Sequence, residues 1–269
     1  MVKEYFSKLA HHWKVLLRDR TYFVSLAIGF LVIFGALVVS MWVSAYKDAT
    51  FYAPVGDLIL EQIPTVNLEF LFTWGFYTII ALICAYPLFK KPELAPFTLK
   101  TFGILLLVRS AFIMLTNVGP PEGFFYQDQL LLNGAIESTA VFRFSNDLFF
   151  SGHTSTPFLA FLLFRKSRFR WVMLFGSFLM GVTVLLMHVH YSIDVFAAFF
   201  IAYGVYAFSD KIFNNLNIRF DRKIRVHGWK ALQEKLKGMR ERRGIRKAGK
   251  LKKKGVLTTN LQNHVNSKI

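Results

Sequence analysis

Residues 148–194, LFFSGHTSTPFLAFLLFRKSRFRWVMLFGSFLMGVTVLLMHVHYSID, contain two histidine motifs separated by two apolar segments and a basic turn. The first motif is Ser151-Gly152-His153-Thr154, and the second runs from His188 to Asp194. Two successive helices that cross a membrane return the chain to the side on which it started. We therefore expect a helical hairpin that brings both motifs to the same side of a membrane.

The composition supports a membrane protein. Hydrophobic residues make up 54% of the 269 residues and aromatic residues 17%, and the mean hydropathy is +0.39. A soluble core could not bury this much apolar chain, so the composition favours a polytopic membrane protein. Cys84 is the single cysteine, which excludes a disulfide within the chain.

Six apolar stretches approach the length of about 20 residues that a membrane helix needs. They are residues 22–43, 68–89, 99–117, 148–164, 171–187 and 191–208. The last three are short, and polar motifs lie at their outer ends, where a protein-lined cavity can accept them. The sequence thus predicts an all-α, six-transmembrane-helix bundle. A catalytic domain at 22–208 follows a basic N-terminus at 1–21 and precedes a polybasic tail at 209–269.

The positions of Lys and Arg predict the orientation, because cytoplasmic loops carry an excess of them. These residues gather before the first, third and fifth spans and after the sixth. Examples are Lys14 and Arg18, then Lys90, Lys91 and Lys100, then Arg165, Lys166, Arg168 and Arg170. With six spans these segments share one side. We therefore expect both termini in the cytoplasm and both histidine motifs on the extracytoplasmic side.

The C-terminal tail carries most of the net charge of +17. Residues 211–254 hold 17 Lys and Arg against three Asp and Glu. Apolar residues recur in it at helical spacing: Trp229, Leu232, Leu236 and Met239. This pattern predicts an amphipathic helix bound to anionic lipid headgroups. Contact with RNA or the ribosome is a minor alternative, and we expect no nucleic-acid partner.

The second motif carries the predicted nucleophile. His190 and Asp194 are four residues apart, which places two side chains on one face of a helix. A carboxylate there can hold an imidazole N–H, fix the tautomer and make the other nitrogen a stronger nucleophile. Such an imidazole can attack phosphorus. Because an ionisable group at the start of a span costs roughly 2.5–3.5 kcal/mol, we interpret Asp194 as functional.

The first motif carries the predicted acid and base. Ser151 and Gly152 precede His153 at the expected start of a span. A helix N-terminus offers free N–H groups to an anion, and a glycine allows close approach of the backbone. Ser151 and Gly152 are therefore predicted to bind phosphate, and His153 to protonate a departing alkoxide.

Several other residues are candidates on weaker grounds. Arg109 interrupts the third span and could bind phosphate, snorkel to the headgroups or form an ion pair. Arg143 is a second candidate for the phosphate, and Asp147 and Glu122 are possible pocket acids. We interpret His188 as a hydrogen-bonded residue near the interface. Metal binding by the three histidines and Asp194 stays open as an alternative, but the proposed chemistry requires no metal and no cofactor.

The two motifs resemble those of the sphingomyelin synthase-like branch of the lipid phosphate phosphatase superfamily. The resemblance extends to Ser145–Phe150, to the series Arg109, Thr116, Pro120 and Pro121, and to Pro54-Val55-Gly56-Asp57, and so covers residues 20–208. It implies a six-span fold in which His190 accepts the phosphoryl group, Asp194 is its partner, and His153 is the acid and base.

The chain departs from the ordinary phosphatase branch of that superfamily. It contains no Arg-Pro pair, and Thr183-Val184 stands where that branch has Ser-Arg. It departs from the synthases in having Ser145-Asn146 in place of Cys-Gly and Ser192 in place of Thr. The first two differences argue against the phosphatase branch and leave open which cations hold the phosphate.

The sequence therefore predicts an integral membrane phosphotransferase. It would move a phosphorylated headgroup from a phospholipid donor to a lipid alcohol such as ceramide at the extracytoplasmic face. The alternatives are a hydrolase with the same site, acting as a lipid phosphatase or like a phospholipase C, and a lipid transporter or scramblase. A bacterial inner membrane is favoured over a Golgi or plasma membrane, and the headgroup and the oligomeric state stay open.

Overall fold

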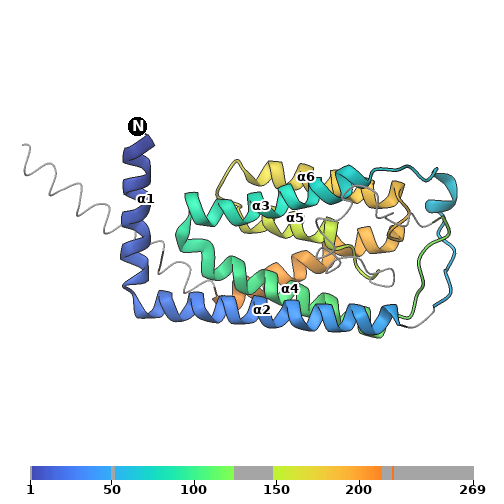
Figure 1. Ribbon diagram of the computed structural model, residues 1–269, viewed down its shortest axis with the longest axis horizontal. Helices are drawn as coiled ribbons and strands as arrows, with labels where there is room; N and C mark the ends of the chain where they lie inside the picture. Colours follow the sequence, from blue (N-terminus) through green and yellow to red (C-terminus); the bar gives the residue numbers. More distant parts are fainter. Residues whose placement is uncertain (1, 50–51, 124–147, 214–219, 221–269) are drawn as a thin grey trace, which may run out of the picture. The chain divides into compact units, whose positions relative to one another are not determined.

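The structure, a computed structural model, describes residues 2–49, 52–123, 148–213 and 220. Within these ranges the chain forms helices and no strands, which confirms the all-α prediction (Figure 1). The predicted tail helix, from Trp229 to Met239, lies outside the described residues.

The first two helices belong to the predicted cytoplasmic end and the first span. Helix α1 spans Val2–Leu17, and α2 spans Arg20–Asp48 and runs across the direction of α1 (Figure 1). Asp19 caps α2 by accepting hydrogen bonds from the backbone N–H groups of Thr21 and Tyr22. The indole N–H of Trp13 donates to the carbonyl of Leu88 at 3.0 Å, which fastens α1 to the end of the second membrane helix.

The second membrane helix is continuous but changes its winding. It consists of a π-helical turn η2 at Leu71–Gly75, helix α3 at Phe76–Ala85 and a second π-helical turn η3 at Tyr86–Lys90. Two short 3-10 turns flank it, η1 at Leu60–Gln62 and η4 at Pro92–Leu94.

Helix α4 spans Ala95–Leu115 and starts four residues earlier than predicted, because Pro96 fits a first helical turn. Lys100 therefore lies inside this helix and not in a cytoplasmic loop. Its ammonium is buried, donates to Ser25 Oγ at 2.8 Å and lies 4.3 Å from the ring centre of Phe213. Its charge is thus held against α2 and the last membrane helix.

Residues 148–194 fold into two helices and the start of a third. Helix α5 spans Gly152–Leu163 and α6 spans Arg170–Leu186. A further helix, which has no label in Figure 1, spans Ser192–Phe213 and so continues five residues past the predicted end of the catalytic domain.

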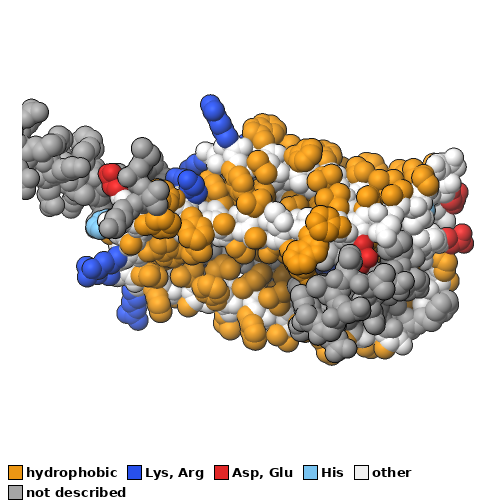
Figure 2. Space-filling model, turned by 45° about the horizontal axis from the view of Figure 1, so that its top comes forward, with side chains coloured by type: hydrophobic (Ala, Val, Ile, Leu, Met, Phe, Trp, Pro, Cys, Tyr) orange, Lys and Arg blue, Asp and Glu red, His pale blue; other side chains and the backbone are white. Residues whose placement is uncertain are grey.

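Four helices in the described part of the chain are long and apolar enough to cross a membrane: Arg20–Lys47, Leu71–Lys90, Pro92–Leu115 and Ser192–Phe213. Helix α6 is apolar but has 17 residues, and α5 has 12. In Figure 2, hydrophobic side chains cover much of the visible face. Lys and Arg gather at the end near α1, and most of the visible Asp and Glu lie at the opposite end. The six-span topology and its orientation stay predictions.

Glycines let the membrane helices approach closely. An ideal Cβ on Gly103 of α4 would lie 2.7 Å from Val32 Cγ1 of α2, and one on Gly29 of α2 would lie 3.0 Å from Leu99 Cβ of α4. Helices α5 and α6 are joined by the Ser177 hydroxyl, which donates to the carbonyl of Thr154 at 2.8 Å. Small residues and interhelical hydrogen bonds are the usual means of packing helices in lipid.

Candidate active site

His190 and Asp194 are in contact, but by a different local structure than a shared helical face. The helix begins at Ser192, and His190 precedes it in a turn. Asp194 Oδ2 lies 3.3 Å from His190 Nδ1 and accepts the backbone N–H of Tyr191 at 3.0 Å. An acidic residue at the third helical position that reaches back to the N-cap backbone N–H is half of a capping box. The carboxylate thus shapes the turn and orients the imidazole.

This contact determines which nitrogen of His190 can react. With its proton on Nδ1 toward Asp194, the imidazole keeps the lone pair of Nε2 available. Both side chains are buried, His190 at 6% and Asp194 at 2% exposure, which strengthens their electrostatic interaction.

Asp57 holds the start of the same helix from a distant loop. Its Oδ2 accepts the backbone N–H of Ser192 at 2.7 Å, and its Oδ1 accepts those of Ile59 and Leu60. Burial raises the pKa of Asp57, but these hydrogen bonds outweigh it, so the pKa lies below its ordinary value. A charged carboxylate is thereby fixed against the N-terminus of the helix that carries Asp194.

The two histidine motifs meet through the backbone. The N–H of Ser151 donates to the carbonyl of Asp194 at 3.2 Å. An ideal Cβ on Gly181 would lie 3.2 Å from Val195 Cγ1 and 3.5 Å from Thr154 Oγ1, so α6 also holds the two helix starts close together. The structure therefore brings together segments that are about 40 residues apart in the sequence.

His153 lies at the first turn of α5. Ser151 is the N-cap, and its hydroxyl oxygen accepts the N–H of Thr154 at 3.4 Å. The imidazole of His153 is stacked between the rings of Phe72 and Phe76, with 4.0 Å between ring centres on each side. Arg109 and His190 lie close enough to interact electrostatically with it.

Arg109 reaches this helix start from α4. Its Nε donates to the carbonyl of Phe150 at 2.9 Å, and an ideal Cβ on Gly152 would lie 3.4 Å from the same Nε. The guanidinium thus runs beside the first residue of α5. A cation next to free helical N–H groups is a suitable environment for a phosphate.

His188 is held in a structural position. Its Nδ1 lies 3.0 Å from the carbonyl of Glu122 and its Nε2 lies 3.3 Å from the carbonyl of Ile63. His188 has a positive φ of 51°. Gly123, whose φ is 75°, packs against it, because an ideal Cβ on Gly123 would lie 3.2 Å from His188 Nδ1. Both ring nitrogens of His188 therefore join loops and do not face His190.

Tyr191 fastens two loops to the second motif. Its hydroxyl donates to the carbonyl of Gly119 at 2.9 Å and accepts the backbone N–H of Val55 at 3.1 Å. Gly119 also donates its N–H to the carbonyl of Ala53 at 3.0 Å. Any side chain at Gly119 would collide with the backbone of Tyr52, because an ideal Cβ on Gly119 would lie 1.9 Å from the carbonyl oxygen of Tyr52.

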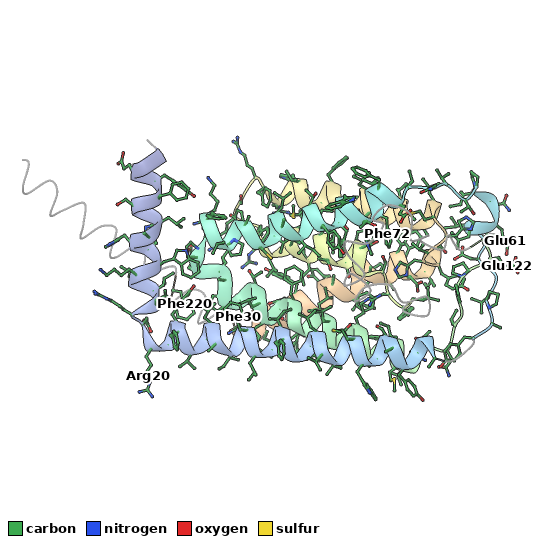
Figure 3. The ribbon with its side chains drawn as sticks, in the orientation of Figure 1. Arg20, Phe30, Glu61, Phe72, Glu122 and Phe220 are labelled. Carbon is green, nitrogen blue, oxygen red and sulfur yellow. The ribbon has the colours of Figure 1, made fainter. Side chains whose placement is uncertain are left out.

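The remaining candidates are less informative. The backbone carbonyl of Glu122 contacts His188 Nδ1. The exposed side chain of Glu122 lies at the same end of the molecule as Glu61 (Figure 3). Arg143 and Asp147 lie outside the described residues. Within the described ranges, no three His, Cys, Asp or Glu residues are grouped as metal ligands would be.

Residues 145–211 match the family described as PAP2 superfamily C-terminal. The match contains His153, His190 and Asp194 and covers a quarter of the chain. It supports a relationship to the phosphatidic acid phosphatase superfamily, with phosphatase-like or phosphotransferase chemistry on lipid phosphates. Together with the apolar helices it indicates an integral membrane protein. A search of curated proteins gave no match.

Sequence reasoning did not find three parts of this site. Phe72 and Phe76 are two among 30 phenylalanines, and nothing in their spacing points to His153. Tyr191 directly follows His190, but nothing in its position indicates the hydrogen bonds to Val55 and Gly119. Asp57 carried a signal in Pro54-Val55-Gly56-Asp57, but its contact with Ser192 depends on a fold that joins residues 135 positions apart.

Proposed function

We propose that the protein is a membrane phosphotransferase that moves a phosphorylated headgroup from a phospholipid to a lipid alcohol such as ceramide. The observation that carries this proposal is the 3.2 Å hydrogen bond between Ser151 and Asp194, which joins the two histidine motifs at one end of the helices. The family match over the same residues supports chemistry on a lipid phosphate.

In the first step, His190 Nε2 attacks the phosphorus of the donor. A bond forms between nitrogen and phosphorus, and the bond between phosphorus and the diacylglycerol oxygen breaks. His153 gives its proton to that oxygen, which leaves as an alcohol. The Asp194 carboxylate beside Nδ1 stabilises the positive charge that develops on the His190 ring.

In the second step, the acceptor hydroxyl loses its proton to His153 and its oxygen attacks phosphorus. The bond to His190 breaks, and the headgroup leaves on the new lipid. His153 then carries the proton that the next cycle needs, so protons and bonds balance over the two steps without a cofactor.

The phosphate oxygens would lie at the start of α5. Gly152 offers a backbone N–H group there, and Arg109 runs alongside. The backbone N–H of Ser151 is already donated to the carbonyl of Asp194, so Ser151 would contribute its hydroxyl. Donors aimed at the charge that develops in the transition state lower the barrier most. We therefore assign Ser151, Gly152 and Arg109 to phosphate binding.

The test is headgroup transfer by purified protein in detergent micelles. Donors labelled in the headgroup, with choline, ethanolamine or inositol, are supplied with and without ceramide. We expect labelled sphingolipid only with ceramide, and loss of at least 100-fold in rate for His190→Ala. His11→Ala is the matched control, because His11 is exposed on α1. Equal product from the His190→Ala protein would contradict the mechanism.

A hydrolase is the second candidate, because the matched family supports phosphatase-like chemistry equally well. Water would then resolve the adduct on His190 in place of a lipid alcohol. Release of inorganic phosphate or free phosphorylated headgroup without ceramide, in the same assay, favours hydrolysis.

A further inference from the structure

His153 is covered on both faces by phenylalanine rings. The Phe72 ring is nearly parallel to the imidazole, at 22°, and the Phe76 ring is inclined at 32°. Both centre distances are 4.0 Å, shorter than the 4.5–7 Å typical of aromatic pairs. The two nitrogens of an imidazole lie on the ring edge, so this arrangement covers the faces and leaves the reactive edge uncovered by these rings.

The two phenylalanines come from a place where the helix changes its winding. Phe72 lies in the π-helical turn η2, and Phe76 is the first residue of α3. Residues four apart share one face of a helix. A wider turn between them alters their separation along that face, and such turns occur frequently at functional sites. Figure 3 labels Phe72 on this segment.

The segment with these rings is backed by close packing on α6. An ideal Cβ on Gly75 of η2 would lie 3.6 Å from Met180 Sδ, and one on Gly176 of α6 would lie 3.1 Å from Ile79 Cδ1 of α3. Met180 is fully buried. Closely packed interiors transmit strain and have low compressibility. Helix α6, which leads into the second histidine motif, therefore holds the segment that carries the two rings.

We propose that Phe72 and Phe76 are positioning residues for His153, which hold its imidazole in the one plane that keeps its ring edge toward the reacting oxygen. The inference rests on the proposed function, in which His153 gives and takes the proton. Because they act through the orientation of His153, we expect the two phenylalanines to affect the chemical step and not lipid binding.

The enzymatic test compares Phe72→Leu, Phe76→Leu and Phe72→Tyr in the transfer assay. Leucine keeps an apolar side chain but removes the flat face, whereas tyrosine keeps the face. We expect each leucine variant to lose about 10- to 100-fold in kcat, the cost of misplacing a catalytic group by about 1 Å, with KM within about twofold. Phe72→Tyr should retain most of kcat. Phe34→Leu is the control, because Phe34 is 66% exposed on α2.

A second measurement does not depend on activity. In protein labelled with ¹³C-histidine, stacked rings shift the ring proton resonances of His153 upfield, and the signal is assigned by its loss in His153→Ala. We expect it to move downfield in both leucine variants and to stay in place in Phe72→Tyr and Phe34→Leu. Circular dichroism and gel filtration show that each variant is folded, and two leucine variants are compared so that one misfolded protein does not end the test.

The outcomes separate the two proposals. An unshifted His153 resonance in the unaltered protein would overturn the stacking. A shifted resonance with unchanged kcat in both leucine variants would overturn the positioning role. If the unaltered protein neither transfers a headgroup nor hydrolyses lipid, the proposed function is wrong. The resonances of His153 still show whether the two rings stack on it.

Discussion

At the scale of single residues, carboxylates at one helix start have different tasks. Asp194 orients His190 and accepts the N–H of Tyr191, whereas Asp57 accepts the next N–H, that of Ser192, from a loop far away in the sequence. The free N–H groups at a helix start need such acceptors. Because Asp57 binds beside the turn that carries His190 and hydrogen-bonds to no histidine within the described residues, its effect on stability can be measured separately from the proposed chemistry.

We expect Asp57→Asn to lower the free energy of unfolding by about 0.3–1 kcal/mol at pH 7, the usual size for a negative charge at a solvent-screened helix N-terminus, because asparagine keeps an acceptor oxygen but loses the charge. The pKa of Asp57 is lowered in the folded protein. Its charge therefore stabilises fully above the unfolded pKa of about 3.9 and progressively less as the pH falls toward the folded pKa.

Thermal unfolding in detergent micelles between pH 3 and pH 7 measures this effect. The gap between the unaltered protein and Asp57→Asn should be constant above about pH 5 and shrink below about pH 4. Glu61→Gln removes an exposed carboxylate from the same loop and should show no such gap. A gap that widens toward low pH would contradict the assignment.

At the scale of the helices, close contact between α2 and α4 aligns the C-terminal end of α2 with the loop that follows α4, where Lys47 meets Thr116. Arg109, on α4, depends on this alignment to reach the start of α5. Lys47 is fully buried at the end of α2 and donates to the carbonyl of Thr116 at 2.8 Å, just after α4. Glycines in the contact and a buried lysine at its end thus fix the position of the candidate phosphate ligand.

We expect Gly103→Ala to destabilise the protein by about 1–3 kcal/mol, the typical cost of overpacking. The new methyl group would lie 2.7 Å from Val32 Cγ1 and 3.1 Å from the Ile33 backbone nitrogen, so the helices must separate. Gly35→Ala is the matched control, because nothing lies within 4 Å of an added Cβ there. The melting temperatures of both variants are measured by thermal unfolding in the same detergent. Equal melting temperatures for Gly103→Ala and Gly35→Ala would show that α2 and α4 are not in close contact at Gly103.

At the scale of the whole molecule, charge separates along the direction of the helices. Basic side chains gather near α1 (Figure 2), and Glu61 and Glu122 lie at the opposite end (Figure 3). Asp57 contacts the second histidine motif through the backbone N–H of Ser192. This agrees with an excess of Lys and Arg on the cytoplasmic side. The orientation remains a prediction and can be tested by the reactivity of introduced cysteines.

We expect Leu58→Cys to react with a membrane-impermeant maleimide in right-side-out vesicles, and Arg168→Cys to react only after detergent is added. Leu58 is 80% exposed in the loop before η1, and Arg168 is exposed in the turn between α5 and α6. The native Cys84 is exposed, so it is first replaced by serine. The reverse labelling pattern would place the histidine motifs in the cytoplasm.

The sequence by itself determined the helical class and the candidates for catalysis. Apolar length and composition are properties of the chain, and the spacing of His190 and Asp194 is local, so both can be recognised without a fold. Arg109 and Ser151 can also be recognised this way, because a charge inside an apolar run and a cap residue near the start of one are both visible in the sequence.

Only the tertiary structure decided how these residues meet. The bond from Ser151 to Asp194, the Phe72 and Phe76 rings on His153 and the contact of Asp57 with Ser192 join residues between 43 and 135 positions apart. No local pattern specifies such contacts, because they follow from how whole helices pack through glycines and how loops fill the space between helix ends. Phe72 and Phe76, two of 30 phenylalanines, come to lie beside His153 only when η2 and α3 pack against α5 and α6.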